Sequence, residues 1–242
     1  MSRYVLVTRS EATLDEIRAA LAPHAIEALA YPVLRDAPIE DTDGWDRVAA
    51  ALGSVRMIAM TSARAADPFR RGALSRGLWP ALGTLPVAAV GRATARAAEA
   101  VGLRVELTGT AGAAALVDRL AARLEGDAAV VHPCGRDRRD ELGEGLRRAG
   151  RAVIPVAVYA MDPTPVAELP ALPAQPPLAV LLSSPRAARA YAAATAGRFA
   201  GVPHFAMGAT TAAAAAELGL AVATLADPTP DALVEELCQI CS

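Results

Sequence analysis

Small hydroxyl residues, glycines and arginines recur together in six short segments of the chain. These segments cover residues 8–10, 61–64, 91–94, 134–137, 183–186 and 208–211. Each follows an apolar run and precedes a helical pattern, so its backbone amides are expected at a helix N-terminus, where anions bind. Arginine forks add charge-assisted hydrogen bonds to carboxylates or phosphates. Six such segments together would suit a ligand that carries several negative charges.

Helix capping is the plainer interpretation of any single segment, because Ser and Thr are preferred at N-caps. The repetition of the pattern along the chain favours a binding function. Tyr159 is the other candidate for chemistry, since few other titratable side chains lie near these segments. Its plainer interpretation is an amphipathic residue that packs its ring and exposes its hydroxyl.

All 24 basic residues are arginines, and lysine is absent. Schiff-base chemistry and covalent pyridoxal phosphate need a lysine amine, as does a Walker-type phosphate loop, so these classes are excluded. The net charge of -2 argues against a nucleic-acid-binding protein. The apolar run at residues 4–7 is too short for a signal peptide, and no stretch is long enough to span a membrane. We therefore expect a cytoplasmic protein.

The cysteines and histidines form no recognisable metal or redox motif. Cys238 and Cys241 make a lone CxxC, whereas a structural zinc site needs four ligands. We expect no metal site and structural roles for the three histidines. The partial fingerprint Gly143-x-Gly145 lies inside a helical pattern, not after a strand, so dinucleotide binding is not predicted.

One segment of the chain occurs twice. GRATARAAEAVGLRV begins at Gly91, and GATTAAAAAELGLAV begins at Gly208, an offset of 117 residues. This period is too long for a solenoid repeat but fits a domain-sized unit. The sequence therefore predicts two similar lobes with a cleft between them.

Short β-type runs alternate with helical patterns, which is typical of parallel α/β units. Ser10 is expected to cap the first helix. We predict ten strands, five in each repeat. They lie near residues 5–7, 26–30, 57–60, 87–90, 105–107, 129–132, 152–156, 179–182, 204–207 and 221–225.

Two extended, proline-bearing segments interrupt this alternation, at residues 31–38 and 155–163. Each follows the second strand of a repeat. If both cross between the lobes, each lobe is assembled from parts of both repeats. If neither crosses, the lobes are sequential. Spacing alone does not choose between these arrangements.

Taken together, the motifs resemble the uroporphyrinogen-III synthase family over nearly the whole chain. The resemblance rests on VLVTR near the start, MTSARAA at 60–66, AVGRATARAAEAVG at 89–102, HPCGRDRRDEL at 132–142, VAVYAMDP at 156–163, LLSSPRAARAY at 181–191 and AMGATTAAAAAELG at 206–219. Each motif is weak alone, but their order and spacing are specific. An asparagine often found two places after Ser62 is Arg64 here, so that contact differs.

The resemblance implies two similar flavodoxin-like lobes with parallel five-stranded sheets, joined by a two-stranded β-ladder. It selects the crossing arrangement. Lobe one would comprise residues 1–34 and 165–242, lobe two would comprise residues 38–157, and the linkers would be residues 31–38 and 156–165.

The resemblance also implies an activity. The family cyclises hydroxymethylbilane, a linear tetrapyrrole with eight carboxylates, to uroporphyrinogen III. The reaction loses water and inverts ring D through a spirocyclic intermediate, and it requires no cofactor. Such an enzyme is a hydro-lyase of haem biosynthesis. We expect a monomer that receives its substrate from hydroxymethylbilane synthase and binds neither nucleic acid nor membrane.

The family's linker tyrosine matches Tyr159, which is the predicted catalytic residue. The predicted substrate-binding residues are Arg9, Thr61, Ser62, Ala63, Arg64, Gly91, Thr94, Gly135, Arg136, Ser183, Ser184, Gly208, Thr210 and Thr211, with Arg186 as a further candidate. The alternative hypothesis is a non-catalytic two-lobed binding or sensory module for a small polyanion, because a fold does not fix a function.

Overall fold

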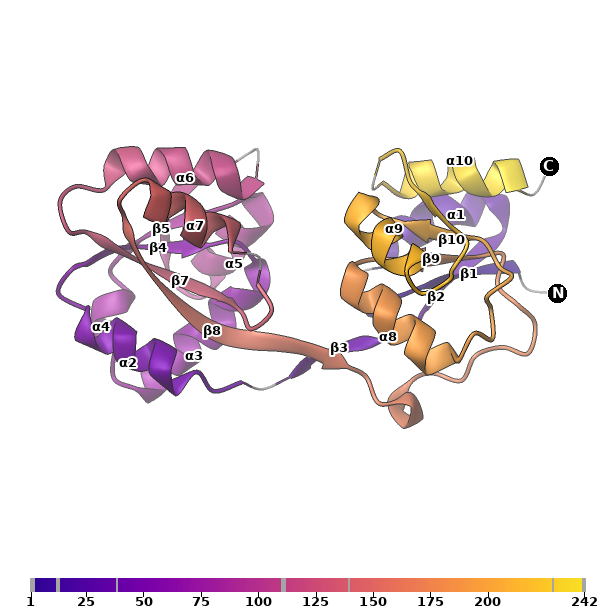
Figure 1. The fold of residues 1–242 in the computed structure, drawn as a ribbon, viewed down its shortest axis with the longest axis horizontal. Coiled ribbons are helices and arrows are strands. Elements are labelled where there is room, and N and C mark those ends of the chain that lie inside the picture. Colours follow the sequence, from indigo (N-terminus) through magenta and orange to yellow (C-terminus); the bar gives the residue numbers. More distant parts are fainter. Residues whose placement is uncertain are drawn as a thin grey trace. The chain divides into compact units, whose positions relative to one another are not determined.

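The chain folds into two compact units that each contain one sheet (Figure 1). The computed structural model describes residues 3–11, 14–37, 39–109, 112–138, 140–227 and 229–240. Unit 1 comprises Met1–Arg35 and Asp162–Ser242, and unit 2 comprises Asp36–Met161. Within the described ranges, no helix has both the length and the apolar character needed to cross a membrane.

Unit 1 contains a parallel five-stranded sheet with the strand order β11-β10-β9-β1-β2. Its elements are β1 (Arg3–Val7), α1 (Asp15–Leu21), η2 (Ala22–His24), β2 (Ile26–Ala30), η4 (Val166–Glu168), β9 (Ala179–Leu182), α8 (Pro185–Thr195), β10 (His204–Ala206), α9 (Ala209–Ala216), β11 (Val222–Thr224) and α10 (Pro230–Ile240).

Alternate residues of the strands in unit 1 face two different cores. Leu6 and Val180 pack against α8 and α9, whereas Val5 and Leu181 pack against α1 and α10. Because successive side chains of a strand point to opposite faces, one apolar run supplies both cores. The sheet of unit 1 is therefore covered by helices on both faces.

Unit 2 contains the second sheet, with the order β3-β8-β7-β4-β5-β6. Its strands are β3 (Leu34–Ala37), β4 (Val55–Met60), β5 (Pro86–Ala89), β6 (Arg104–Thr108), β7 (Ala129–Gly135) and β8 (Ala152–Pro163). Its helices are α2 (Thr42–Ala50), η3 (Ala63–Ala65), α3 (Ala66–Ser75), α4 (Trp79–Leu82), α5 (Arg92–Ala100), α6 (Gly112–Arg123) and α7 (Glu141–Arg148). From β8 to β6 the pairs are parallel.

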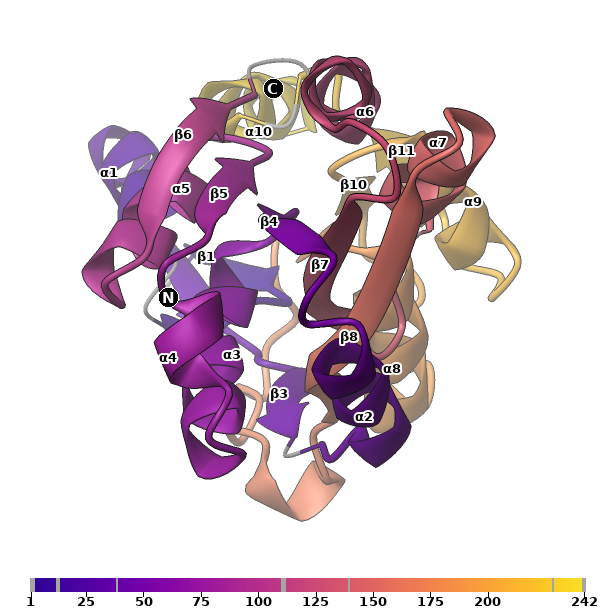
Figure 2. The same cartoon turned by 90° about the vertical axis from the view of Figure 1, so that its left-hand side faces the viewer.

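Helices cover both faces of this sheet too (Figure 2). Ile58 and Met60 of β4 face a core formed with α2 to α5, where Trp45 stacks on Phe69 at a centroid distance of 5.6 Å. Met57 of β4 faces the opposite core, formed with α6 and α7. The predicted α/β class with parallel sheets is confirmed. Because the strands are parallel, the carboxyl ends of several of them lie together at one edge of each sheet.

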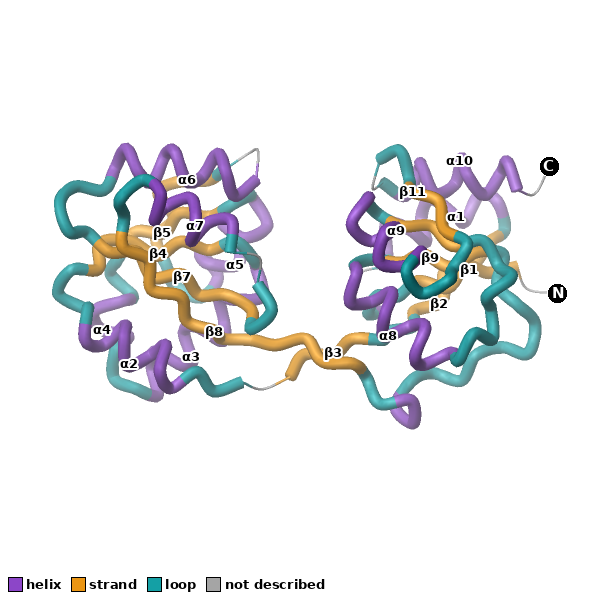
Figure 3. Tube along the Cα trace, in the orientation of Figure 1, coloured by secondary structure: helices purple, strands orange, loops and turns teal. Residues whose placement is uncertain are grey.

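The sheet of unit 2 has six strands: the five expected for the repeat, β8-β7-β4-β5-β6, and β3 at its edge. Residues 34–37 belong to a linker that was expected to form one strand of a two-stranded ladder; they form β3 and pair with β8. β8 continues to Pro163, well beyond the predicted strand at 152–156 (Figure 3). β3 and β8 each extend across the boundary between the units. A proline-bearing edge strand lacks the alternating pattern of a core strand, so periodicity alone did not reveal β3, and only the family resemblance implied a paired linker there.

Local capping also differs from the prediction at the start of the chain. Helix α1 begins at Asp15, and its N-cap is Leu14, which makes no capping hydrogen bond through its side chain. Ser10 is therefore not the N-cap. Helix α2 was not predicted. Gly44 interrupts its helical pattern, and its buried large residues are Trp45 and Val48, which are too few to show a helical period.

Asp41 joins the start of α2 to β8. One carboxylate oxygen accepts a hydrogen bond from the Gly44 amide at 2.9 Å, and the other accepts one from the Ala157 amide at 2.8 Å. We predict that Asp41→Ala lowers the free energy of unfolding of unit 2 by about 2 kcal/mol, because it removes an N-cap and a cross-link together. Asp41→Asn keeps an oxygen acceptor and should lose less.

Tryptophan fluorescence during urea unfolding measures this effect in unit 2 alone, since Trp45 and Trp79, the chain's two tryptophans, both lie there. Equal transition midpoints for the wild type and Asp41→Ala would show that Asp41 stabilises neither α2 nor its junction with β8.

Candidate functional site

The segment after β4 presents backbone amides at the start of a helical run. Ser62 is the N-cap of η3, and its hydroxyl accepts a hydrogen bond from the Arg64 amide at 3.3 Å. Thr61 and Ser62 are half-buried, while Ala63 and Arg64 are exposed. Amides of a first helical turn have no intrahelical partners, so this segment can accept an anion.

Tyr159 lies on β8 directly beside Gly135 of β7. The register of the β7–β8 pair shifts between Cys134 and Gly135, and this irregularity places Tyr159 opposite Gly135. The Arg136 amide donates a hydrogen bond to the Tyr159 carbonyl at 2.9 Å. A Cβ at Gly135 would lie 3.0 Å from two ring carbons of Tyr159. Gly135 therefore allows the ring to rest against the backbone of β7.

A cavity of about 1050 Å³ in unit 2 brings predicted residues from separate segments together. Ala63, Arg64 and Tyr159 line it, together with Trp45 and residues of α3. This volume is in the upper range for sites that hold an organic ligand. The structure thus places the predicted catalytic tyrosine and one predicted arginine on the same cavity.

The arginines around the cavity differ in their partners. Arg71 pairs with Asp67 at 3.0 Å, and Arg76 pairs with Glu40 at 3.2 Å while lying over the Trp45 ring. Arg64 has no ion-pair partner among the described residues. Its guanidinium is therefore available to a carboxylate without first breaking an internal ion pair.

Three further predicted segments also lie at helix N-termini, each within its own unit. Gly91 is the N-cap of α5, Gly208 is the N-cap of α9, and Ser184 is the N-cap of α8. A Cβ added at Gly91 or Gly208 would meet no atom within 4 Å, so the space beside both backbones is open. The Ser184 hydroxyl accepts a hydrogen bond from the Ala187 amide at 3.1 Å.

The remaining two segments do not start helices. α7 begins at Glu141, so the residues around Gly135 belong to the end of β7, and Gly135 itself is buried. The segment at residues 8–10 follows β1, whereas α1 begins only at Asp15. The expectation of six helix N-termini is therefore wrong for these two segments.

Several predicted side chains already have internal contacts. Arg9 donates to the Met207 sulfur at 2.9 Å, Arg136 lies 3.6 Å from Asp137, and Arg186 lies 4.0 Å from Asp162. Thr94 and Thr211 are 5% and 4% exposed, whereas Thr210 is exposed. The two buried threonines offer little side-chain surface to a ligand.

Burial controls the protonation of the internal histidine and cysteine in unit 2. Burial, with a smaller contribution from Arg138 that Asp140 partly offsets, lowers the pKa of His132 to about 4. Burial raises the pKa of the Cys134 thiol to about 11, so this thiol is protonated at neutral pH. Cys134 is therefore a poor nucleophile.

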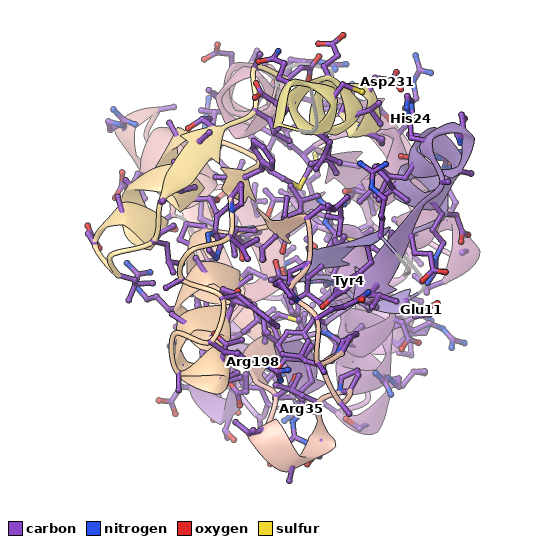
Figure 4. All side chains as sticks on the ribbon, turned by 90° about the vertical axis from the view of Figure 1, so that its right-hand side faces the viewer. Tyr4, Glu11, His24, Arg35, Arg198 and Asp231 are labelled. Atoms are coloured by element: carbon purple, nitrogen blue, oxygen red, sulfur yellow. The ribbon has the colours of Figure 1, made fainter. Side chains whose placement is uncertain are left out.

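Unit 1 has a cavity of about 250 Å³ that contains none of the predicted site residues. It is lined in part by His24 and Cys238, and Figure 4 shows His24 on the side of unit 1 that carries Asp231. Cys241 lies outside the described residues. Among the residues described, no three His, Cys, Asp or Glu side chains are grouped so that they could hold a metal ion.

Comparison with protein families matches residues 15–235 to the family described as uroporphyrinogen-III synthase HemD. The chain belongs to this family. The family predicted from the sequence motifs is therefore confirmed. Comparison with the curated protein sequences finds no match.

Solved structures of family members share the fold. Uroporphyrinogen-III synthetase from Helicobacter pylori 26695 aligns with a TM-score of 0.69 at 13% identity, covering 98% of this chain and 99% of that one. A mutant uroporphyrinogen III synthase from the extremely thermophilic bacterium Thermus thermophilus aligns with a TM-score of 0.60 at 17% identity, with the same coverage. At these identities the structures support the fold, and the family match carries the assignment.

Among the lining residues that sequence reasoning missed are Trp45, Arg71 and Arg76. The four-residue spacing of Asp67 and Arg71 marks one face of a helix, which was a usable signal. Trp45 lies on the unpredicted helix α2, so its position could not be inferred.

We predict that Gly135→Ala destabilises the chain by about 1 kcal/mol, because the added methyl group crowds the Tyr159 ring. Removing the ring with Tyr159→Ala should abolish this cost, so a double-mutant cycle measured by urea unfolding isolates the contact. Gly53→Ala is the matched control, since its Cβ would meet nothing within 4 Å. An undiminished cost in the Tyr159→Ala background would contradict the proposed packing.

Proposed function

We propose that the chain catalyses the reaction of its family, the cyclisation of hydroxymethylbilane to uroporphyrinogen III with loss of water and inversion of ring D. The observation that carries this proposal is the cavity of unit 2, which combines Tyr159, the Ala63 amide and Arg64 in a chain matched to the family over residues 15–235. A polycarboxylate needs many donors, and helix amides and arginines supply them without lysine.

The protein's main task in this reaction is to hold and enclose the substrate. A pyrrole nitrogen of hydroxymethylbilane can expel the terminal hydroxyl, which leaves as water and generates an azafulvene. The electrophilic carbon is then attacked by ring D, and the spirocyclic intermediate rearranges to the inverted ring. No redox partner is needed, because the overall change is the loss of water and a rearrangement of carbon–carbon bonds.

Tyr159 is proposed as the catalytic residue. Its hydroxyl donates a hydrogen bond or a proton to the departing hydroxyl group, which makes water the leaving group. Support comes from its place on the cavity beside Arg64 and from the glycine that accommodates its ring.

We propose that the substrate carboxylates are bound by the turns of both units. Support is strongest for amides at helix starts, namely those near Ala63, Gly91, Ser184 and Gly208, because these N-termini are accessible or open. The proposed binding residues remain Arg9, Thr61, Ser62, Ala63, Arg64, Gly91, Thr94, Gly135, Arg136, Ser183, Ser184, Gly208, Thr210 and Thr211. Arg64 is favoured among the arginines because no ion pair to it occurs within the part of the chain that the structure describes.

The finer architecture is likewise a proposal. We take residues 1–34 and 165–242 as one flavodoxin-like lobe, residues 38–157 as the other, and residues 31–38 and 156–165 as a two-stranded linker. The equivalent strand orders β11-β10-β9-β1-β2 and β6-β5-β4-β7-β8, together with the pairing of β3 and β8, support this division.

We further propose a cytoplasmic monomer that receives hydroxymethylbilane directly from hydroxymethylbilane synthase. The substrate also closes spontaneously, without inversion, to the type I isomer. A short transfer between the two enzymes would limit that loss.

The deciding experiment mixes the purified chain with enzymatically generated hydroxymethylbilane and separates the oxidised porphyrin isomers. We expect the type III isomer. Type I alone, the spontaneous product, would contradict the proposed activity and support a non-catalytic binding module.

We predict that Tyr159→Phe lowers kcat roughly ten- to a hundredfold and leaves measurable activity, because substrate positioning survives while one proton donor is lost. Tyr4→Phe is the control: the Tyr4 hydroxyl donates to the Gln175 carbonyl inside unit 1, so its loss should leave kcat unchanged. Turnover of Tyr159→Phe at the wild-type rate would remove Tyr159 from the mechanism.

A further inference from the structure

The buried imidazole of His132 contacts a predicted substrate-binding residue. His132 lies on β7 and is 1% exposed, and its Nε2 lies 3.2 Å from the Thr61 Oγ1 at the end of β4. β4 and β7 are paired neighbours in the sheet of unit 2 (Figure 2). The other ring nitrogen, Nδ1, is buried and has no hydrogen-bond partner among the described residues.

The unpartnered nitrogen distinguishes the two neutral tautomers of His132. A neutral imidazole carries one N–H donor and one acceptor nitrogen. If Nδ1 carried the proton, an N–H donor would be buried without an acceptor, and orphaned donors are the rarer and costlier defect. The favoured tautomer therefore carries its proton on Nε2, which donates to the Thr61 Oγ1.

The charge state of His132 is consistent with this tautomer. Burial and, to a smaller extent, Arg138 hold its pKa at about 4 against the opposing influence of Asp140. The nearby Cys134 thiol is protonated. His132 is therefore neutral at pH 7, so one of its nitrogens is an acceptor.

Unit 1 handles its hydroxyl groups differently at the equivalent strand ends. Thr8 Oγ1 donates to the Leu181 carbonyl at 3.0 Å, and Ser183 Oγ donates to the Thr8 carbonyl at 2.9 Å. Both hydroxyl protons are therefore used by backbone acceptors. The Thr61 hydroxyl has only His132 as its partner among the described residues.

We propose that His132 is a positioning residue, an inference that rests on the proposed function. Its Nε2–H donates to the Thr61 Oγ1, so that the Thr61 O–H is left to donate to a carboxylate of the substrate. Thr61 lies two residues before Ala63, which lines the cavity of unit 2 with Arg64. Thr61 is half-buried and is not among the residues that line this cavity, so the carboxylate that receives its hydroxyl donor is one bound at the end of β4 beside the cavity.

The tautomer is measured directly by ¹⁵N NMR of the imidazole rings in the ligand-free chain. The chain has three histidines, so His132→Gln assigns the relevant signals. We expect a neutral ring protonated at Nε2 between pH 5 and pH 8. A ring protonated at Nδ1, or one that gains a second proton near pH 6.5, would overturn the proposal.

The consequence for binding is measured with uroporphyrin, an octacarboxylate, as the probe. His132→Leu removes the donor, and Thr61→Val removes the hydroxyl. Each should weaken binding about tenfold, as expected for the loss of one hydrogen bond to a charged group. The two effects should not add in the double variant, because they belong to one chain of hydrogen bonds. His132→Gln and Thr61→Ser retain the donor and the hydroxyl, and should recover binding.

His204→Leu is the matched control. His204 of β10 is also a buried histidine with an unpartnered Nδ1, and its Nε2 contacts the Tyr191 hydroxyl at 3.4 Å inside unit 1. This variant should lose stability and keep its affinity for uroporphyrin. Equal affinities of His132→Leu and His204→Leu, or no binding by the wild type, would overturn the proposal.

The porphyrin-isomer assay separates this inference from the proposed activity. Formation of type I alone, together with the expected tautomer and the expected losses of uroporphyrin affinity, would refute the cyclisation and leave the carboxylate site in place. Formation of type III with affinities unaffected by His132→Leu would refute the role of His132 and leave the cyclisation in place.

Discussion

The pairing of β7 with its two neighbours organises the candidate site. β4 on one side fixes Thr61 near His132, and β8 on the other side fixes Tyr159 opposite Gly135. A one-residue shift of any of these strands would turn its side chains to the other face of the sheet. The local irregularity at Gly135 is of the kind that redirects a side chain at a functional site, because an extra residue bends the strand. The hydrophobic cores on both faces lock this register.

A second constraint is the limited supply of unpaired positive charge near the predicted turns. The chain has no lysine, and most arginines near the predicted turns have internal partners. In the proposed function, anion binding depends on amides whose orientation the helices fix and on a few side chains that other residues orient. Such donors need little reorganisation when a ligand arrives, which favours preorganised electrostatic stabilisation. The neutral imidazole of His132 fits this scheme, because it orders a hydroxyl without adding a charge to the interior.

The sequence predicted the α/β class, most strand positions and the family, because periodic apolar runs and ordered motifs report these directly. Periodicity did not reveal β3, which only the family resemblance implied as part of a two-stranded linker, and α2 was not predicted because Gly44 weakens its helical pattern. The site was predicted only in part. Tyr159, Ala63 and Arg64 meet at one cavity, but the roles of Gly135 and His132 depend on cross-strand register. Register depends on contacts between segments about 70 residues apart, such as Thr61 and His132, which no local pattern encodes.

The insertion of unit 2 between the two parts of unit 1 has a consequence for biosynthesis. On the ribosome, β1 and β2 emerge first, yet Val5 of β1 pairs with Ala179 of β9. Unit 2 is continuous and is complete before that partner has been translated. Domains fold as units as they emerge, so unit 2 can fold while β1 still lacks its partner strand β9. Those apolar strands are the part of the nascent polypeptide most exposed to misassembly or chaperone capture.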